Sequence, residues 1–280
     1  MKTILFTLLY FLCLICSTGL LAQDSSRVIP DSNISDSYYH LTIRSVPKLT
    51  LQFSGFYDYG VFELSANNNG DFNSDEFIKG ENFGVRHGVG GEMTVKIPLQ
   101  EKGHLRLNVS AAMNIFSSKF SKINVSSNGT PEYVKYDVFS TGIGIENNFT
   151  PSFTFKTLIG IKLLASVISG SANLINDSNG AVNGYNIVPA FRLGLCVYSG
   201  LEYMLNEKFG LNFGFQFTHA NLWLKSTNTS GTGNDIYLDD KKVTPRVPFS
   251  GFKQFAFGSF YGGVNYFFGV EKKEYYYKKF

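Results

Sequence analysis

Ten charged residues occupy alternate positions in segments whose intervening positions are apolar. They are Asp58, Arg86, Glu92, Lys96, Arg106, Glu146, Lys156, Lys162, Arg192 and Glu202. Side chains alternate across a β-strand, so these charges would share the inner face of a sheet that closes on itself. Buried charges are costly unless they are paired and hydrogen-bonded. We therefore expect an ion-pair network that fills the interior, with a narrow gated ion path as the alternative and no wide solute pore.

The residues that usually bind metals do not form a recognisable site. The chain has four histidines without HxH or HxxxH spacing, which are His40, His87, His104 and His219. Such scattered residues give no reason to expect a metal ion or any other cofactor. The acidic residues of the segment DIYLDDKK, Asp235, Asp239 and Asp240, match no dedicated calcium loop. We expect this segment to be an ordinary solvated loop, with Ca²⁺ binding as the alternative.

Eight segments alternate between apolar and small or polar residues, the period of a β-strand. The clearest is FGLNFGFQFTH, in which the apolar positions are Phe209, Leu211, Phe213, Phe215 and Phe217. Glycine and polar residues fill the positions between them, so one face carries aromatic rings and the other is small and polar. We expect strands at about 48–63, 84–98, 104–116, 132–146, 152–168, 185–204, 209–219 and 254–270.

The connections between these segments alternate in length. Short ones fall near Gln100–Gly103, Asn147–Pro151 and Asn206–Lys208, and they have the size of hairpin turns. Long ones, rich in Asn, Ser, Gly and Asp, fall at about 64–83, 117–131, 169–184 and 225–253. This alternation predicts an all-β fold, an eight-stranded antiparallel barrel with both ends of its chain on the short-turn side.

A soluble, lipocalin-like barrel also has one apolar and one polar face. Here the polar face is rich in Gly, Ser and Asn, as in a crowded lumen, and it has few of the Lys and Glu residues of a solvated exterior. Aromatic residues such as Tyr57, Phe153 and Tyr203 lie toward strand ends, where membrane barrels carry aromatic girdles. We therefore predict a transmembrane barrel with short periplasmic turns, long extracellular loops, and the five apolar residues of 209–217 facing lipid.

The two ends of the chain differ from the predicted barrel at 47–270. Residues 1–22 combine Lys2, a long apolar run and a small-residue end at Ala22, the pattern of a cleaved signal peptide; an uncleaved anchor is the alternative. We expect 23–46 to be a partly disordered periplasmic segment, or to contain a short strand at 38–44. The segment 271–280 is a charged periplasmic tail, for which we expect solvent exposure, with contact to phosphate headgroups or a periplasmic partner as the alternative.

Cleavage after Ala22 would leave Cys196 as the one cysteine, so no disulfide could form within the chain. It would also leave 24 basic against 22 acidic residues. This weak positive excess gives no reason to expect nucleic-acid binding.

Three short pieces carry a resemblance to a known class. The GLLAQ end of the leader, the closing GVNYFFG and the terminal Phe280 resemble the small outer-membrane β-barrels of the OmpA/OmpX type and the porin-family barrels of Bacteroidota. The resemblance implies export to the outer membrane of a Gram-negative bacterium, with outer-membrane lipid and lipopolysaccharide as partners and another envelope protein as a further candidate partner. The charged tail after the last strand departs from that pattern, so Phe280 is not expected at the usual terminal girdle position.

One motif hints at an enzyme. Thr218-His219-Ala220-Asn221 resembles the His-x-Ser-Asn motif of outer-membrane lipid A deacylases, with Ala220 where the nucleophilic serine would be. We therefore expect a non-enzymatic barrel that serves as a structural, surface-binding or accessory subunit of an envelope complex. A lipid A-modifying hydrolase and a narrow ion channel or porin are the alternatives.

Overall fold

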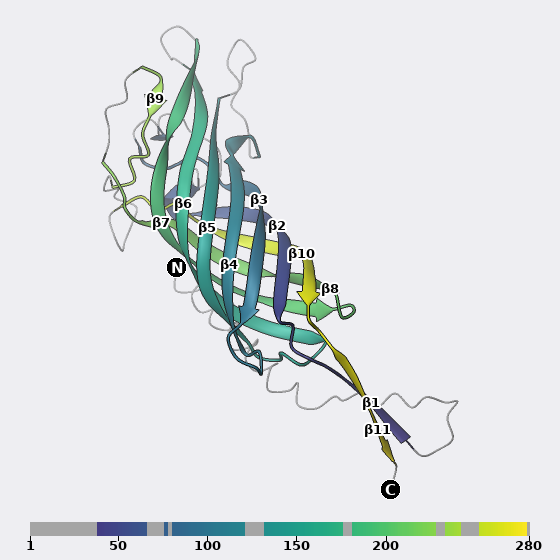
Figure 1. Ribbon diagram of the computed structural model, residues 1–280. Coiled ribbons are helices and arrows are strands. Elements are labelled where there is room, and N and C mark those ends of the chain that lie inside the picture. Colours follow the sequence, from purple (N-terminus) through teal and green to yellow (C-terminus); the bar gives the residue numbers. More distant parts are fainter. Residues whose placement is uncertain are drawn as a thin grey trace, which may run out of the picture.

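The computed structural model describes residues 38–65, 76–77, 80–120, 132–175, 181–227, 233–241 and 252–278. The predicted signal peptide 1–22 and most of the predicted segment 23–46 lie outside them. In the described part, eight strands form a barrel (Figure 1). They are β2 (Leu49–Val61), β3 (His87–Pro98), β4 (Leu105–Ser117), β5 (Tyr133–Asn148), β6 (Phe155–Ile175), β7 (Val182–Met204), β8 (Phe209–Trp223) and β10 (Ala256–Phe268).

Each barrel strand pairs antiparallel with its neighbours in sequence, and β2 pairs with β10 to close the sheet. Closure leaves the main ring without an unpaired edge. The predicted all-β, eight-stranded antiparallel barrel is confirmed. Among the described residues, no helix has the length and apolar character needed to cross a membrane.

The hairpin of β6 and β7 is longer than the sequence predicted. The expected loop at 169–184 is mostly strand, because β6 continues to Ile175 and β7 begins at Val182. A register shift between Ile168 and Gly170 lets the pairing continue, so that Asn173 pairs with Gly184. The small polar residues of this hairpin resemble a loop in composition, but their backbone groups pair across the two strands.

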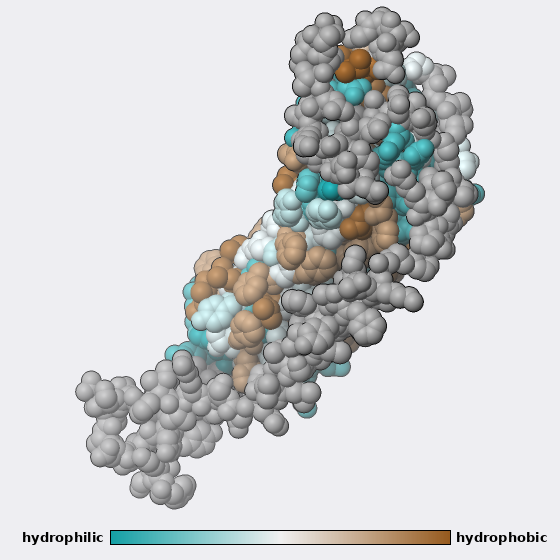
Figure 2. Space-filling model, turned by 180° about the vertical axis from the view of Figure 1, so that it is seen from behind, coloured by the Kyte–Doolittle hydropathy of each residue, from teal (hydrophilic) through white to brown (hydrophobic). Residues whose placement is uncertain are grey.

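The outer surface of the barrel is apolar. In β8, Phe209, Leu211, Phe213 and Phe217 are exposed, and the inward-facing residues between them are buried or half-buried. Phe215 lies half-buried on the same outer face, with its ring centroid 5.4 Å from that of Phe260. Hydrophobic residues cover the middle of the barrel in Figure 2, and hydrophilic ones gather toward the long-loop end. A closed barrel with an apolar outer belt suits a lipid environment.

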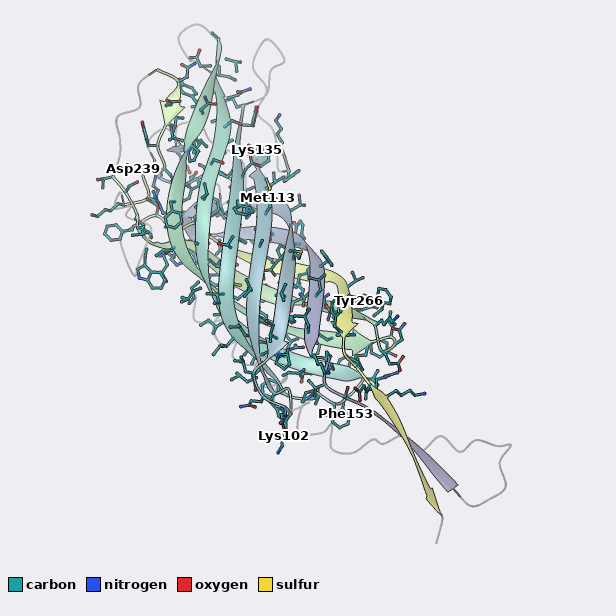
Figure 3. All side chains as sticks on the ribbon, viewed as in Figure 1. Lys102, Met113, Lys135, Phe153, Asp239 and Tyr266 are labelled. Atoms are coloured by element: carbon teal, nitrogen blue, oxygen red, sulfur yellow. The ribbon has the colours of Figure 1, made fainter. Side chains whose placement is uncertain are left out.

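The two ends of the barrel differ in their connections. Short turns link β3 to β4, β5 to β6 and β7 to β8, and Lys102 and Phe153 mark this end in Figure 3. At the other end lie the 3₁₀ turns η1 (Phe62–Leu64) and η2 (Ser118–Phe120). The short strand β9 (Asp235–Ile236), which pairs parallel with β7, also lies there.

A two-stranded ribbon extends from the short-turn end (Figure 1). It consists of β1 (Tyr38–Arg44) and β11 (Lys272–Lys278), which pair antiparallel. The alternative of a strand at 38–44 is therefore confirmed, and the tail is largely a strand as well. The strand leaves the even number of barrel strands unchanged because it pairs with the tail, outside the barrel.

Candidate functional site: the filled lumen

Four charged side chains from four strands meet inside the short-turn half of the barrel. Lys96 Nζ lies 3.0 Å from Glu146 Oε2 and 2.7 Å from Glu202 Oε1. Arg106 donates from Nη1 to Glu202 Oε2 and from Nη2 to Glu202 Oε1, at 3.0 Å each, and it also contacts Glu146. All four side chains are at least 96% buried. We call Lys96, Arg106, Glu146 and Glu202 the ionic quartet.

Strand register brings the quartet together. Arg106 of β4 lies directly opposite Glu146 of β5, and Glu202 approaches from β7, which is not adjacent to β3 or β4 in the barrel. The quartet thus ties distant parts of the wall together. The cost of removing these charges from water offsets most of their mutual attraction, so the intact cluster adds little net stability. Removal of one charge is nevertheless strongly destabilising, because its partners then stay buried without an opposite charge.

A second ion pair lies beside the quartet. Lys162 of β6 contacts Glu92 of β3, and its ammonium lies 5.1 Å from the centroid of the Tyr198 ring. The Tyr198 hydroxyl donates to Glu146 Oε2 at 3.1 Å, which connects this pair to the quartet. A cavity of about 10 Å³, the size of about one water molecule, remains among residues that include Glu92, Lys96 and Lys162.

Lys156 is a further buried cation in this region. It is the second residue of β6, is fully buried and lies directly opposite Glu202 in register. Its ammonium lies 5.3 Å from the centroid of the Phe267 ring. Among the described residues, Nζ has no hydrogen-bond partner.

Three of the predicted charges lie apart from this region, and two of them are Asp58 and Arg86. Asp58 of β2 is fully buried nearer the long-loop end and accepts a hydrogen bond from Asn114 Nδ2 at 2.8 Å. Arg86 precedes β3, and its guanidinium carbon lies 6.0 Å from the ring centroid of Tyr59, an exposed residue of the outer surface. Neither residue belongs to the ionic quartet.

Arg192 instead binds a loop at the long-loop end. It donates from Nε to Asp240 Oδ2 at 2.7 Å and from Nη2 to Asp240 Oδ1 at 3.0 Å. The same carboxylate accepts from Asn221 Nδ2 and from the Ser226 amide, at 2.9 Å each. Asn221 Oδ1 accepts from the Phe255 amide at 2.7 Å. The prediction of a solvated acidic loop is wrong for Asp240, because these four donors hold its carboxylate in a fully buried position.

An apolar cluster, which sequence analysis missed, fills the long-loop half of the lumen. The Phe255 ring lies at its centre, with ring centroids 5.3 Å from Phe83, 5.7 Å from Phe116 and 5.4 Å from Tyr136. We call this cluster the apolar plug. Its buried members are Leu64, Phe77, Phe83, Val85, Phe116, Val134, Tyr136, Val138, Ile168, Ala172, Leu174, Ile187, Ala220, Leu238, Phe255 and Phe257.

The sequence did contain a signal for the plug. Phe116, Tyr136 and Val138 face inward on their strands, whereas most inward positions nearer the short-turn end of these strands are polar or glycine. An inward face that becomes apolar at the loop-side end, next to aromatic residues in the loops, predicts loops packed into the barrel mouth. Together, the plug and the charged region occupy both halves of the lumen in the part of the chain that the structure describes.

The geometry around His219 does not assemble a hydrolytic site. His219 Nε2 is buried and has no hydrogen-bond partner among the residues that the structure describes. Ala220, at the position where a deacylase would have serine, is buried in the apolar plug. In the part of the chain that the structure describes, no Ser, Thr or acidic side chain is hydrogen-bonded to His219. No cluster of three or more His, Cys, Asp or Glu residues there could hold a metal ion.

The chain matches no protein-family model and no curated protein. Its fold is similar to several solved outer-membrane barrels. Neisserial surface protein A is 14% identical, covering 79% of this chain and 97% of that one, with a TM-score of 0.45. The N-terminal β-barrel domain of Pseudomonas aeruginosa OprF is 10% identical, covering 78% and 96%, with a TM-score of 0.35. Outer-membrane protease OmpT from Escherichia coli is 9% identical, covering 89% and 99%, with a TM-score of 0.35. The likeness is one of barrel architecture alone.

Proposed function

We propose that this chain is a non-conducting, non-enzymatic outer-membrane barrel that acts as a structural or accessory subunit of the cell envelope. The observation that carries the proposal is the filled lumen. The apolar plug occupies one half and the ionic quartet, with the Lys162–Glu92 pair, occupies the other. An eight-stranded barrel is just wide enough for side chains to fill, so function belongs to the surfaces of this barrel.

The outer surface supports contact with outer-membrane lipid and lipopolysaccharide. Exposed apolar residues occur on every barrel strand, and Met113, toward the long-loop end of β4, is one of them in Figure 3. Lys135 lies nearer the long-loop end of the same wall. In outer-membrane barrels, long loops face outward and short turns face the periplasm. In this proposal the signal peptide directs export, and the long-loop end faces the cell exterior.

The ribbon of β1 and β11 supports the accessory role. A lone two-stranded ribbon is at best marginally stable in water. Among the described residues, β1 and β11 each pair with one strand, so each has an edge to which another chain could add. The ribbon begins where the barrel ends at the short-turn side, with the Ser45 amide donating to the Glu271 carbonyl oxygen at 2.9 Å. In the proposed orientation it extends into the periplasm, where another envelope protein could bind it.

Planar-bilayer recording tests the filled lumen. The purified chain is expected to produce no unitary current steps above those of protein-free bilayers. Reproducible steps that scale with the amount of protein would overturn the proposal and favour the narrow channel. Phe255→Ala serves as the positive control. It removes the ring at the centre of the plug and should increase the ionic current through the barrel.

Gentle-detergent purification from the native membrane tests the accessory role. A stoichiometric partner should accompany the full chain, and truncation after Glu271, which removes β11, should release it. The truncated chain must retain the barrel's β-sheet circular dichroism for the comparison to count. A full chain that purifies without any partner would contradict an accessory role and leave a stand-alone structural barrel.

A further inference from the structure

A cavity of about 530 Å³ lies at the short-turn end of the barrel. Three segments line it: residues 44–46, which lead from β1 toward β2, residues 101–104 of the β3–β4 turn, and residues 149–153 of the β5–β6 turn. Lys102 and Phe153, both labelled in Figure 3, belong to this lining. Its described residues include none of the charges inside the lumen. The volume suits a small ligand or the headgroup of a lipid.

Direct contacts hold the three walls of this cavity together. Gly103 adopts a positive φ of 71°, and Val46 packs so closely against it that a Cβ there would clash. Arg44 Nη1 donates to Thr154 Oγ1 at 3.2 Å, which joins the first wall to the β5–β6 turn. Arg44 Nε also donates to Glu207 Oε1 at 3.4 Å. The cavity is therefore built into the fold and is not a gap between independent turns.

The cavity presents charges of both signs. Lys102 and Glu101 line it, and neither side chain has an ion-pair or hydrogen-bond partner among the described residues. Arg44 also lines it, and its bonds run through Nε and Nη1, which leaves Nη2 available. Glu101 would repel a simple anion, and the two cations would repel a simple cation. A ligand that carries one negative and one positive group matches this lining.

The cavity borders the apolar outer surface of the barrel. Phe149 and Phe153, in its β5–β6 wall, are exposed. The Phe149 amide donates to the Thr157 carbonyl oxygen at 3.0 Å, so the pairing of the two chain segments continues beyond the end of β5. Ile145 is exposed four residues before Phe149, on the same face. In outer-membrane barrels, aromatic residues border the apolar band at the level of the lipid headgroups.

We propose that this cavity binds the headgroup of a zwitterionic phospholipid of the phosphoethanolamine type. The phosphate accepts from Arg44 Nη2 and Lys102 Nζ. The ammonium group pairs with the Glu101 carboxylate and contacts the Phe149 ring. The acyl chains then lie along the outer surface toward Ile145.

This inference rests on the proposed function, because it places the short-turn end at the periplasmic face of the outer membrane. The two can nevertheless fail separately. A chain without any lipid preference could still be non-conducting in planar bilayers, and a conducting chain could still bind this headgroup.

Native mass spectrometry of the purified full chain in detergent tests the site. The probes are short-chain phosphatidylethanolamine and phosphatidylglycerol, which share the phosphate but differ in the ammonium group. As the first bound lipid, phosphatidylethanolamine should bind roughly fivefold more tightly. Equal affinity, or tighter binding of phosphatidylglycerol, would overturn the proposal. Soluble phosphoethanolamine lacks acyl chains and should displace the lipid poorly; displacement at equal concentration would overturn the assignment to a lipid.

Variants in the exposed β3–β4 turn locate the binding. Glu101→Gln should abolish the preference for phosphatidylethanolamine without weakening phosphatidylglycerol, and a preference that persists would overturn the proposal. Lys102→Met should weaken both lipids by roughly fivefold, and unchanged binding would likewise contradict it. Lys208→Met, in the exposed β7–β8 turn outside the cavity, is the matched control and should bind as wild type does. Circular dichroism of each variant verifies that the barrel is folded.

The same variants separate a lipid from other occupants. A cavity that received a second copy of this chain or a segment of another protein would show no preference between the two lipids. It would also give no reason for that preference to depend on Glu101. Either result would overturn the assignment of the cavity to a phospholipid.

Discussion

Replacing Glu202 with glutamine should be among the most destabilising single substitutions in the charged half of the lumen. The change is nearly isosteric, so its main effect is electrostatic. In wild type, Glu202 accepts from Lys96 at 2.7 Å and from two Arg106 nitrogens at 3.0 Å each. In the variant, Glu146 is the one carboxylate left to Lys96 and Arg106, and Lys156 still lies close by.

The expected cost follows from the burial of the group. The Glu202 side chain is fully buried, and removing one partner of a buried ion pair costs about 3–5 kcal/mol. Glu207, five residues along the chain, offers the comparison. It lies 3.4 Å from Arg44 and its side chain is 38% exposed, so Glu207→Gln should cost about 0–1 kcal/mol. The two Glu→Gln changes differ in burial far more than in chemistry.

Equilibrium unfolding in denaturant, with the barrel in detergent or lipid vesicles and Trp223 as the probe, measures both costs by linear extrapolation. Adding Lys156→Met to Glu202→Gln should recover part of the loss, because it removes one of three cations that share Glu146. A double-mutant cycle gives this coupling directly. If Glu202→Gln costs no more than Glu207→Gln, or if Lys156→Met gives no recovery, the electrostatic reasoning about the quartet is wrong.

Three further outcomes follow from the plug, the outer belt and a loop-side carboxylate. Phe255→Ala should lower the free energy of unfolding by about 3–5 kcal/mol, because its ring packs at the centre of the plug; denaturant unfolding measures it. Trp223 is exposed on the outer surface near the long-loop end of β8, so lipids brominated near the headgroup should quench its fluorescence more than lipids brominated at the chain end. Burial raises the pKa of the Glu63 carboxyl, which lies outside the membrane-spanning strands, above its ordinary value of 4.5. The stabilisation from protonated Glu63 is therefore complete below pH 4.5 and is lost as the pH rises through the folded-state pKa. The free energy of unfolding, measured across this pH range, should lack this pH dependence in Glu63→Gln.

The period of two in the sequence was sufficient to predict the barrel wall. In β8, the apolar positions Phe209, Leu211, Phe213 and Phe217 face outward, as the alternation indicated. This works because a strand closed into a barrel has two distinct environments and each residue can face only one of them. The alternation of short and long connections then determined the number of barrel strands and the side on which the ends lie.

Pairing between charges could not be derived in the same way. Alternation places Lys96, Arg106, Glu146 and Glu202 on the inward face, but their contacts depend on height along the barrel. That height depends on register, and register follows from bulges such as the one between Ile168 and Gly170. Arg86 illustrates the limit, since it lies one residue before β3 begins and thus outside the regular alternation.

The apolar plug and the ionic quartet depend on each other because they share one narrow lumen. Ion pairs in contact with water contribute little to stability. In a quartet that water does not reach, any arrangement that leaves a charge unpaired is costly, so the four side chains keep one arrangement. The plug closes the mouth of the barrel with loop residues such as Phe83 and Phe255. The bonds from Arg192 to Asp240 hold one of those loops in place. Loops usually tolerate change more readily than strands, but here loop residues exclude water from charges in the wall. Opening the plug should therefore weaken the electrostatic coupling within the quartet, although no plug residue belongs to it.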